Sequence, residues 1–244
     1  MKKLIFLVCA LLMNLAFSVE GFDLHTASFY GDINEAVSLL NSGSQIDLVN
    51  DEGETSILIA SKRGNIKVVN LLISHGANLN KADSYLNTPL SVAIARGDHD
   101  TVKLLLSHGA DVTRANGYLR TSLMLSVKAG DLKTAKKLLK FKVLIDKKDK
   151  DGYTALMYAA KHGHNLIAKE LILSHSRLDL VSNKRETALF LASERGNLEM
   201  VKDLVAAGAD FNIKSMYFGT SLSIANRNKH IHIVNFLESI GAVK

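Results

Sequence analysis

A short, mostly apolar phrase recurs along this chain at a fixed interval. Six copies begin with a threonine, at Thr55, Thr88, Thr121, Thr154, Thr187 and Thr220, and each step is 33 residues long. One further step back from Thr55 reaches Phe22, which opens a weaker seventh copy, "FDLHTA". Self-similarity with a period of roughly 20–50 residues indicates a repeat architecture. The chain is therefore predicted to be a row of similar units.

Two other positions keep the same period and predict two helices in each unit. Nine residues after the anchor stand Gly31, Gly64, Gly97, Gly130, Gly163 and Gly196, and the last copy has Lys229 there. Seventeen residues after the anchor every copy has a leucine, from Leu39 to Leu237. We expect the threonine to cap a first helix and the glycine to close it in a left-handed conformation. The leucine then belongs to the buried face of a second helix.

The units are expected to stack, because one helix pair cannot bury its apolar face alone. A small residue five places after each anchor allows neighbouring units to approach closely; the set is Ala27, Ala60, Ala93, Ser126, Ala159, Ala192 and Ala225. In the last copy Glu238 replaces the apolar residue that follows the leucine in the inner copies, such as Ile73. A charge there fits a capping unit, so we expect the row to end with this copy.

These residues resemble the ankyrin repeat, with its pattern Thr-Pro-Leu-His-x-Ala, then Gly, Leu-Leu and Gly-Ala-Asp-x-Asn. The resemblance covers residues 22–244. It implies an all-α ankyrin-repeat solenoid of about seven helix-turn-helix repeats with short hairpin-like turns, anchored near residues 22, 55, 88, 121, 154, 187 and 220. The pattern's glycine–alanine turn is replaced by "FKVLID" (141–146) and "SHSRLD" (174–179). These departures predict a looser or bent junction near the middle of the row.

The first 18 residues have the pattern of a secretory signal. "MKK" precedes the apolar run Leu4–Phe17, and small residues precede a cleavage point after Ser18. A membrane-spanning helix needs about 20 apolar residues, and this run is shorter. A lipid anchor on Cys9 is a lesser alternative, because Val8 stands where a small residue is expected. We expect a signal peptide over 1–18, an ankyrin repeat domain over 19–244, and export to a bacterial periplasm, with secretion as the alternative.

Removing the signal changes the charge and the thiol content. The whole chain has 30 Lys and Arg against 24 Asp and Glu, a formal net charge of +6. Lys2 and Lys3 leave with the signal, so 28 bases remain and the net charge falls to about +4. Cys9, the only cysteine, leaves as well. A chain without thiols suits an oxidising compartment, because nothing in it can mispair.

The resemblance to ankyrin repeats also implies a concave binding face, built from the hairpin tips and the two positions before each closing glycine. On this face the sequence places bases edged with tyrosines. The candidate partner-binding residues are Tyr30, Lys62, Arg63, Tyr85, Arg96, Tyr118, Arg120, Lys128, Tyr153, Lys161, His162, Arg195, Tyr217 and Arg227. Arginine and tyrosine are enriched at binding hot spots. The set predicts a protein partner with an acidic or anionic surface, and the alternative is an ordinary solvated polar face.

The sequence gives little support for catalysis or for a cofactor. It contains no glycine-rich phosphate loop, no serine nucleophile elbow and no HExxH motif. His75 and His108 occupy equivalent places on neighbouring units, and helices packed about 8–10 Å apart cannot share a zinc ion that needs ligands near about 2 Å. We expect no enzyme activity, no cofactor, no metal and no nucleic-acid partner.

Together these features predict a monomeric, exported protein–protein interaction scaffold, either an adaptor or an inhibitor of an exported enzyme. Two alternatives stay open. The protein could be a secreted effector that binds a host target, or, with weaker support, a haem or metal carrier that uses its nine histidines.

Overall fold

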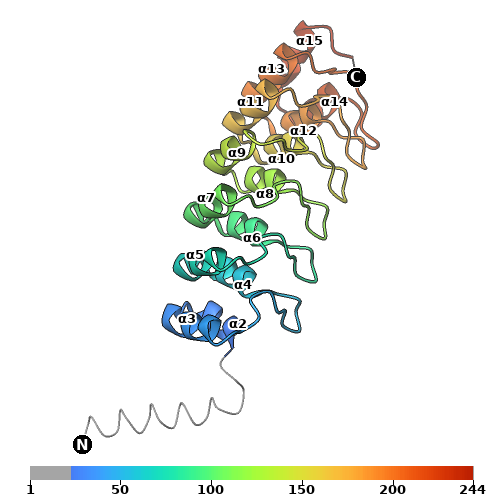
Figure 1. The fold of residues 1–244 in the computed structure, drawn as a ribbon. Coiled ribbons are helices and arrows are strands. Elements are labelled where there is room, and N and C mark those ends of the chain that lie inside the picture. Colours follow the sequence, from blue (N-terminus) through green and yellow to red (C-terminus); the bar gives the residue numbers. More distant parts are fainter. Residues whose placement is uncertain (1–22, 244) are drawn as a thin grey trace, which may run out of the picture.

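The computed structural model describes residues 23–243, and these residues form fourteen α-helices in seven pairs (Figure 1). The first helices of the pairs are α2 (Leu24–Tyr30), α4 (Ser56–Arg63), α6 (Pro89–Arg96), α8 (Ser122–Lys128), α10 (Ala155–His162), α12 (Ala188–Arg195) and α14 (Ser221–Arg227). The second helices are α3 (Ile33–Asn41), α5 (Ile66–Ser74), α7 (His99–Ser107), α9 (Leu132–Leu138), α11 (Asn165–Leu173), α13 (Leu198–Ala206) and α15 (Ile231–Ser239). No strand occurs within 23–243. The predicted all-α solenoid is confirmed, whereas the predicted signal peptide and Phe22 lie outside the described residues.

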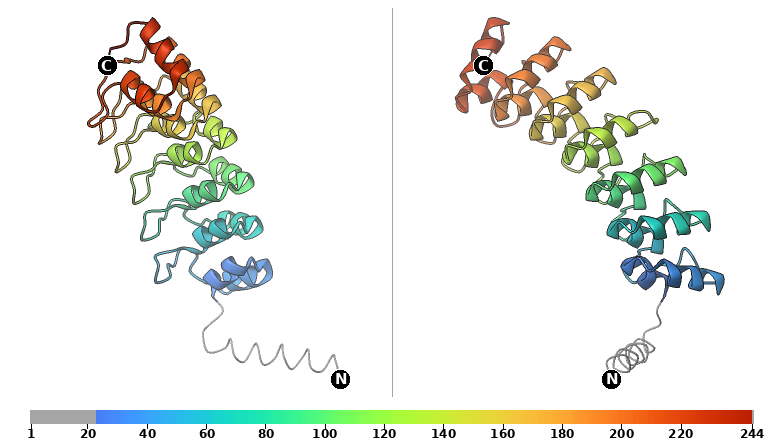
Figure 2. Two further views of the ribbon diagram at one scale, coloured as in Figure 1. Left: turned by 180° about the vertical axis from the view of Figure 1, so that it is seen from behind. Right: turned by 90° about the vertical axis from the view of Figure 1, so that its left-hand side faces the viewer.

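The pairs stack into a curved row, and a hairpin projects from the same side of the row between successive pairs (Figure 2). Successive first helices contact one another, as do most successive second helices. The seven small residues five places after the anchors, such as Ala60 and Ser126, are all fully buried. Of the seven periodic leucines, only Leu39 in the first repeat is not fully buried, and Glu238 in the last repeat is exposed. The apolar core therefore runs continuously between the repeats.

Threonine side chains cap the first helices of repeats two to seven, as expected. Each accepts a hydrogen bond from the backbone N–H three residues on, for example Thr154 from Met157. The first repeat differs, because Asp23 performs this role and accepts from the N–H of Thr26 at 2.9 Å. The helix α2 consequently begins one residue later than an anchor at Phe22 predicts. A phenylalanine offers no acceptor, so the cap falls to the next suitable side chain.

The closing glycines have the predicted left-handed backbone, and most of them also receive a side chain from the next repeat. Gly163, with φ +77°, lies against Arg195, and a Cβ added there would come within 2.8 Å of the Arg195 Nε. Arg195 also donates from Nη1 to the carbonyl oxygen of Lys161 at 3.0 Å. Gly97 has a similar φ of +75°, but a Cβ there would meet nothing within 4 Å. A comparison of these two glycines therefore distinguishes the cost of the left-handed backbone from the cost of disturbing the packing between repeats.

The junction between repeats three and four is the loosest along the second helices. The helices α7 and α9 make less extensive contact than the other neighbouring second helices. The helix α9 is two residues shorter than α7 and α11, and the "FKVLID" segment follows it. In repeat five, within "SHSRLD", His175 adopts a left-handed φ of +63° at the place where every other repeat except the fourth has glycine. The row nevertheless continues past both segments (Figure 2).

We predict that Gly163→Ala destabilises the protein more than Gly97→Ala. Each substitution forces a Cβ into a left-handed backbone, at a cost of about 1 kcal/mol. Gly163→Ala also displaces Arg195 and its hydrogen bond, which adds about 1 kcal/mol. Urea unfolding of both variants measures the difference, and equal losses would show that the contact with Arg195 does not contribute.

Candidate protein-binding face

The hairpin tips form a continuous edge along the row. The backbone N–H of Gly117 donates to the carbonyl oxygen of Tyr85 at 2.7 Å, and that of Lys150 donates to Tyr118 at 3.0 Å. Equivalent bonds join the other tips from residue 52 to residue 216. We call the surface made of these tips and the ends of the first helices the hairpin side. It corresponds to the concave face predicted from the sequence.

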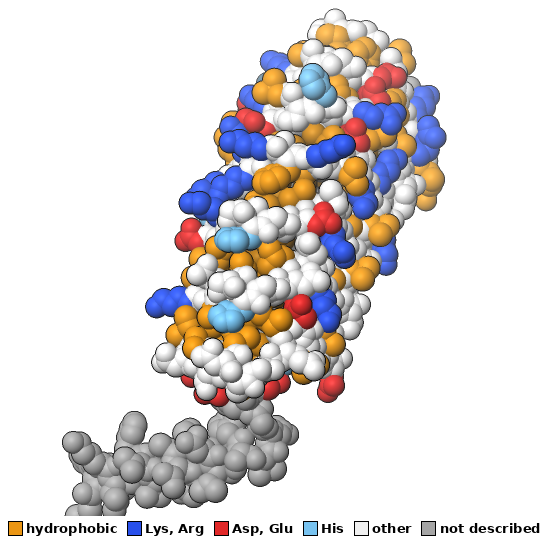
Figure 3. All heavy atoms as spheres, viewed as in Figure 1, with side chains coloured by type: hydrophobic (Ala, Val, Ile, Leu, Met, Phe, Trp, Pro, Cys, Tyr) orange, Lys and Arg blue, Asp and Glu red, His pale blue; other side chains and the backbone are white. Residues whose placement is uncertain are grey.

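Most of the fourteen predicted partner residues present exposed side chains on the hairpin side. The exposed ones are Tyr30, Lys62, Arg63, Tyr85, Arg96, Tyr118, Lys128, Lys161, Arg195, Tyr217 and Arg227, and the half-buried ones are Arg120, Tyr153 and His162. Figure 3 shows Lys and Arg side chains along the hairpin side and also along the second helices. Basic charge alone therefore does not distinguish this side, whereas its exposed tyrosines do.

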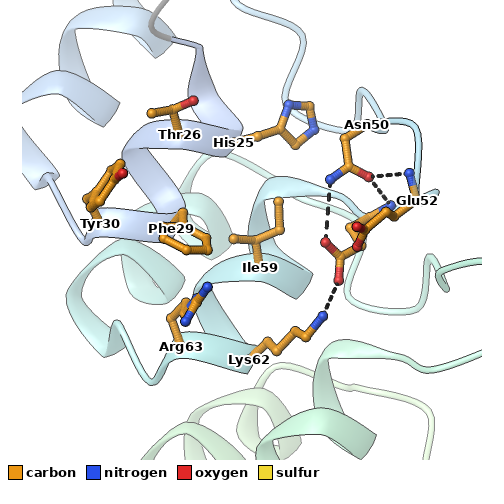
Figure 4. A pocket seen from close by; sticks show the side chains of 10 residues that line it. His25, Thr26, Phe29, Tyr30, Asn50, Glu52, Ile59, Lys62 and Arg63 are labelled. Atoms are coloured by element: carbon orange, nitrogen blue, oxygen red, sulfur yellow. Dashed lines mark hydrogen bonds and ion pairs between the residues drawn. The ribbon is translucent and has the colours of Figure 1, made fainter.

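Several of the predicted arginines also hold the repeats together. Arg96 and Arg195 each end a first helix and donate to the carbonyl near the end of the preceding first helix, at 3.5 and 3.0 Å. The guanidinium carbon of Arg63 lies 3.5 Å from the centre of the Phe29 ring (Figure 4). The bonds of Arg96 and Arg195 satisfy carbonyl groups that a helix end leaves without partners. Changing these arginines would therefore disturb stability together with any binding.

The first repeat borders a hollow of about 490 Å³ on the same side (Figure 4). Phe29, Tyr30 and Arg63 line it, together with Lys62. The Lys62 ammonium pairs with the buried carboxylate of Glu54 at 2.9 Å, and this hydrogen bond raises the pKa of Lys62. Lys62 is thus largely neutralised within the chain. The hollow offers an aromatic surface with two engaged bases, Lys62 and Arg63.

A buried polar network explains why Arg120 does not resemble the other candidates. Its Nε donates to the Asp149 Oδ2 at 3.2 Å and to the Tyr158 hydroxyl at 3.0 Å, and that hydroxyl donates to the Asp149 Oδ2 at 2.5 Å. The Asp149 side chain is only 1% exposed. Burial, and then the bond to Asp149, raise the pKa of Tyr158 to about 12, so its phenol stays protonated. Arg120, predicted as a partner residue, lies here as a structural bridge between repeats four and five.

We predict that Arg120→Ala lowers the free energy of unfolding by about 3 kcal/mol, because it leaves the buried Asp149 carboxylate without its cation. Lys150→Ala, on the exposed neighbouring tip, is the matched control and should change stability by less than about 0.5 kcal/mol. Chemical denaturation measures both variants. A loss for Arg120→Ala as small as that of the control would contradict the structural role.

Repeats four to six bring four basic groups together, and we call Lys128, Lys161, His162 and Arg195 the basic centre. The His162 ring stacks on Tyr158, with ring centres 6.1 Å apart, and on His164 at 5.9 Å. Burial lowers the pKa of His162, and the neighbouring His164, Lys161, Lys128 and Arg195 lower it further. The lowered pKa leaves the His162 ring uncharged near neutral pH, so Lys128, Lys161 and Arg195 supply the positive potential of the basic centre. Such a potential attracts carboxylates or phosphates.

Tyr153 connects the basic centre with a buried acid. Its hydroxyl donates to the Glu186 Oε2 at 2.7 Å, and the Lys161 ammonium lies 4.5 Å from the centre of its ring. Burial and the Glu186 carboxylate raise the pKa of Tyr153. Glu186 itself is buried. Sequence reasoning missed Glu186, Asp149 and Tyr158, since nothing in the repeat pattern distinguishes them from ordinary core or turn residues.

The described residues contain no group of three or more His, Cys, Asp or Glu side chains that could hold a metal ion. The Nδ1 atoms of His75 and His108 each lie 2.9 Å from a carbonyl oxygen of their own helices, Leu71 and Leu104. Within 23–243, no helix is both long enough and apolar enough to cross a bilayer.

Comparisons with known proteins agree with this geometry. The family described as "Ankyrin repeats (3 copies)" matches residues 24–116, 123–215 and 165–243, so the chain belongs to the ankyrin repeat family. Ankyrin repeats bind protein partners, and proteins built from them are generally interaction modules without enzyme activity. The solved ankyrin repeat domain of Bcl-3, described as a unique member of the IκB protein family, is similar to it. The two share 26% identity with a TM-score of 0.76, over 87% of this chain and 97% of that one. No match was found among curated protein sequences.

Proposed function

We propose that this protein is an exported scaffold without enzyme activity that holds an acidic protein partner on its hairpin side. In this role it is an adaptor or an inhibitor for an exported enzyme. The observation that carries the proposal is the basic centre. Neither Lys128 nor Lys161 forms an ion pair with a carboxylate of residues 23–243, although both are exposed. Their charge is thus free to meet an acidic surface.

The fold supports the same use of this surface. Stacked repeats leave an extended face that no further unit covers, and such faces are the usual binding surfaces of solenoids. Exposed tyrosines accompany the bases on this side: Tyr85 and Tyr118 on two adjacent tips, and Tyr217 on the last tip. Tyrosine offers a large contact area at a low entropic cost, so it suits a binding surface. The hairpin side therefore combines positive charge, which attracts an acidic partner, with aromatic side chains that offer it a contact surface.

The partner can be isolated by crosslinking the purified protein, lacking residues 1–18, within an envelope fraction of its native cells. Recovery of one dominant enzyme supports the adaptor or inhibitor role. An activity assay of that enzyme with and without the scaffold then separates the two roles, because an inhibitor lowers turnover and an adaptor does not.

For that partner we predict that the double variant Lys128→Glu, Lys161→Glu weakens binding at least about tenfold, equivalent to about 1.4 kcal/mol. The control is Lys103→Glu, Lys133→Glu, which makes the same change of charge on exposed positions of α7 and α9. Calorimetric titration of both variants measures the effect. Equal weakening by the two pairs would show that net charge, and not the hairpin side, determines binding.

Export is proposed from the N-terminal pattern, where "MKK" precedes the apolar run Leu4–Phe17. We predict that the mature chain begins at Val19 and is recovered in the periplasm. Cell fractionation and N-terminal sequencing measure this. Recovery in the medium or in a host cell favours the alternative of a secreted effector, and recovery of the uncleaved chain in the cytoplasm contradicts export.

A further inference from the structure

Two neighbouring hairpin tips hold leucines in a backbone conformation that normally belongs to glycine. Leu86 has φ +61° and Leu119 has φ +60°. The equivalent positions in the tips before and after them are Gly53 and Gly152, with φ +76° and +79°. A left-handed backbone brings the Cβ of an L-residue too close to the carbonyl that follows it, so a leucine there costs free energy. A glycine would relieve that cost.

The tip turns impose this conformation. The N–H of Leu86 donates to the carbonyl oxygen of Asp83 at 2.9 Å, and that of Leu119 donates to Asn116 at 2.7 Å. The side chain of Asp83 also accepts from the backbone N–H groups of Tyr85 and Asn87. Such a turn ends in a residue with positive φ, which is why glycine is usual there. The turn therefore holds both leucines in the left-handed backbone conformation, which a leucine does not itself prefer.

Packing within the chain leaves about half of each leucine side chain exposed, so it offsets only part of this cost. Leu86 is 55% exposed and Leu119 is 45% exposed, and the tyrosines that precede them, Tyr85 and Tyr118, are 73% and 60% exposed. Strained residues are retained where the surrounding structure fixes them, and they cluster at binding sites. Two strained, exposed leucines beside two exposed tyrosines form an apolar surface on this edge.

Three of these side chains, Tyr85, Leu86 and Tyr118, border one hollow between the two tips that carry the tyrosines. It has a volume of about 410 Å³, and Tyr85, Leu86, Tyr118 and Lys150 are among the residues that line it. We call it the tip groove. The two tips are joined by the 2.7 Å bond from Gly117 to Tyr85, so its walls are fixed relative to each other. The Lys150 ammonium lies 6.0 Å from the centre of the Tyr118 ring and has no carboxylate ion pair within residues 23–243.

We propose that the tip groove is the apolar anchor site of the partner interface. It takes an aromatic or large aliphatic side chain that stands beside carboxylates in an acidic segment of the protein partner. The apolar side chain fills the space between Tyr85, Leu86 and Tyr118, and a neighbouring carboxylate meets Lys150. This assignment rests on the proposed function, because it names the part of the hairpin side that recognises the partner.

The tip groove predicts opposite changes in stability and in binding. Relieving the backbone strain should raise stability, and removing the leucine side chain should weaken binding. The variant Leu86→Gly, Leu119→Gly should raise the melting temperature by roughly 2–4 °C relative to Leu86→Ala, Leu119→Ala, which keeps the strain. Both variants lose the Leu86 side chain that lines the tip groove, so both should weaken the anchor contact equally. A protein that becomes more stable yet binds less well is the expected result.

Two capped acidic peptides serve as probes of the purified protein: Glu-Glu-Phe-Glu-Glu, and Glu-Glu-Gly-Glu-Glu as its control. The phenylalanine peptide should bind at least about fivefold more tightly and shift the NMR signals of the Leu86 methyl groups. Both leucine variants should remove this preference. Lys128→Glu, Lys161→Glu should weaken both peptides and keep the preference.

The outcomes separate the two proposals. If the two peptides bind equally and only Lys128→Glu, Lys161→Glu removes that binding, the tip groove is overturned and the proposed function stands. A preference for the phenylalanine peptide that survives both leucine variants also overturns the tip groove. Binding of neither peptide at millimolar concentration overturns both the tip groove and the acidic partner.

Discussion

The structure depends on one constraint: a single helix pair of this chain cannot cover its own apolar face. Each repeat therefore has to lie against its neighbours, and the positions that face them are restricted. Small residues such as Ala60 and Ala159 are fully buried where first helices meet. Glycines such as Gly163 leave room for a side chain that arrives from the next repeat. The 33-residue period in the sequence follows from this repeated contact.

The same constraint determines which surface can carry function. Stacking uses the two broad faces of every repeat and leaves the hairpin side uncovered. Some basic residues on that side are occupied within the chain, as the bonds of Arg96, Arg195 and Lys62 to neighbouring groups show. Lys128, Lys161 and Lys150 form no such ion pairs within residues 23–243. The division between engaged bases and unpaired lysines separates stability from binding more clearly than the overall charge does.

The fold could be predicted from the sequence because its determinants are local and repeated. Thr154 and Gly163 mark the two ends of one helix, and the same marks recur in most repeats. The first cap was missed because Phe22 cannot accept a hydrogen bond and Asp23 replaces it. The network of Arg120, Asp149 and Tyr158 joins residues 29 and 38 positions apart, so no local pattern could show it. The strain at Leu86 was hidden for a related reason: a leucine stands where the tips at Gly53 and Gly152 have glycine, and only the backbone shows that the conformation is the same.

The central claim is that the hairpin side, and no other surface, holds the partner. Placing a photo-crosslinking amino acid at position 118, and separately at position 133 on the second helix α9, tests it directly within the cells that make the protein. The account predicts that illumination joins one defined protein to position 118 and nothing reproducible to position 133. Crosslinks to the same protein from position 133 but not from position 118 would contradict it.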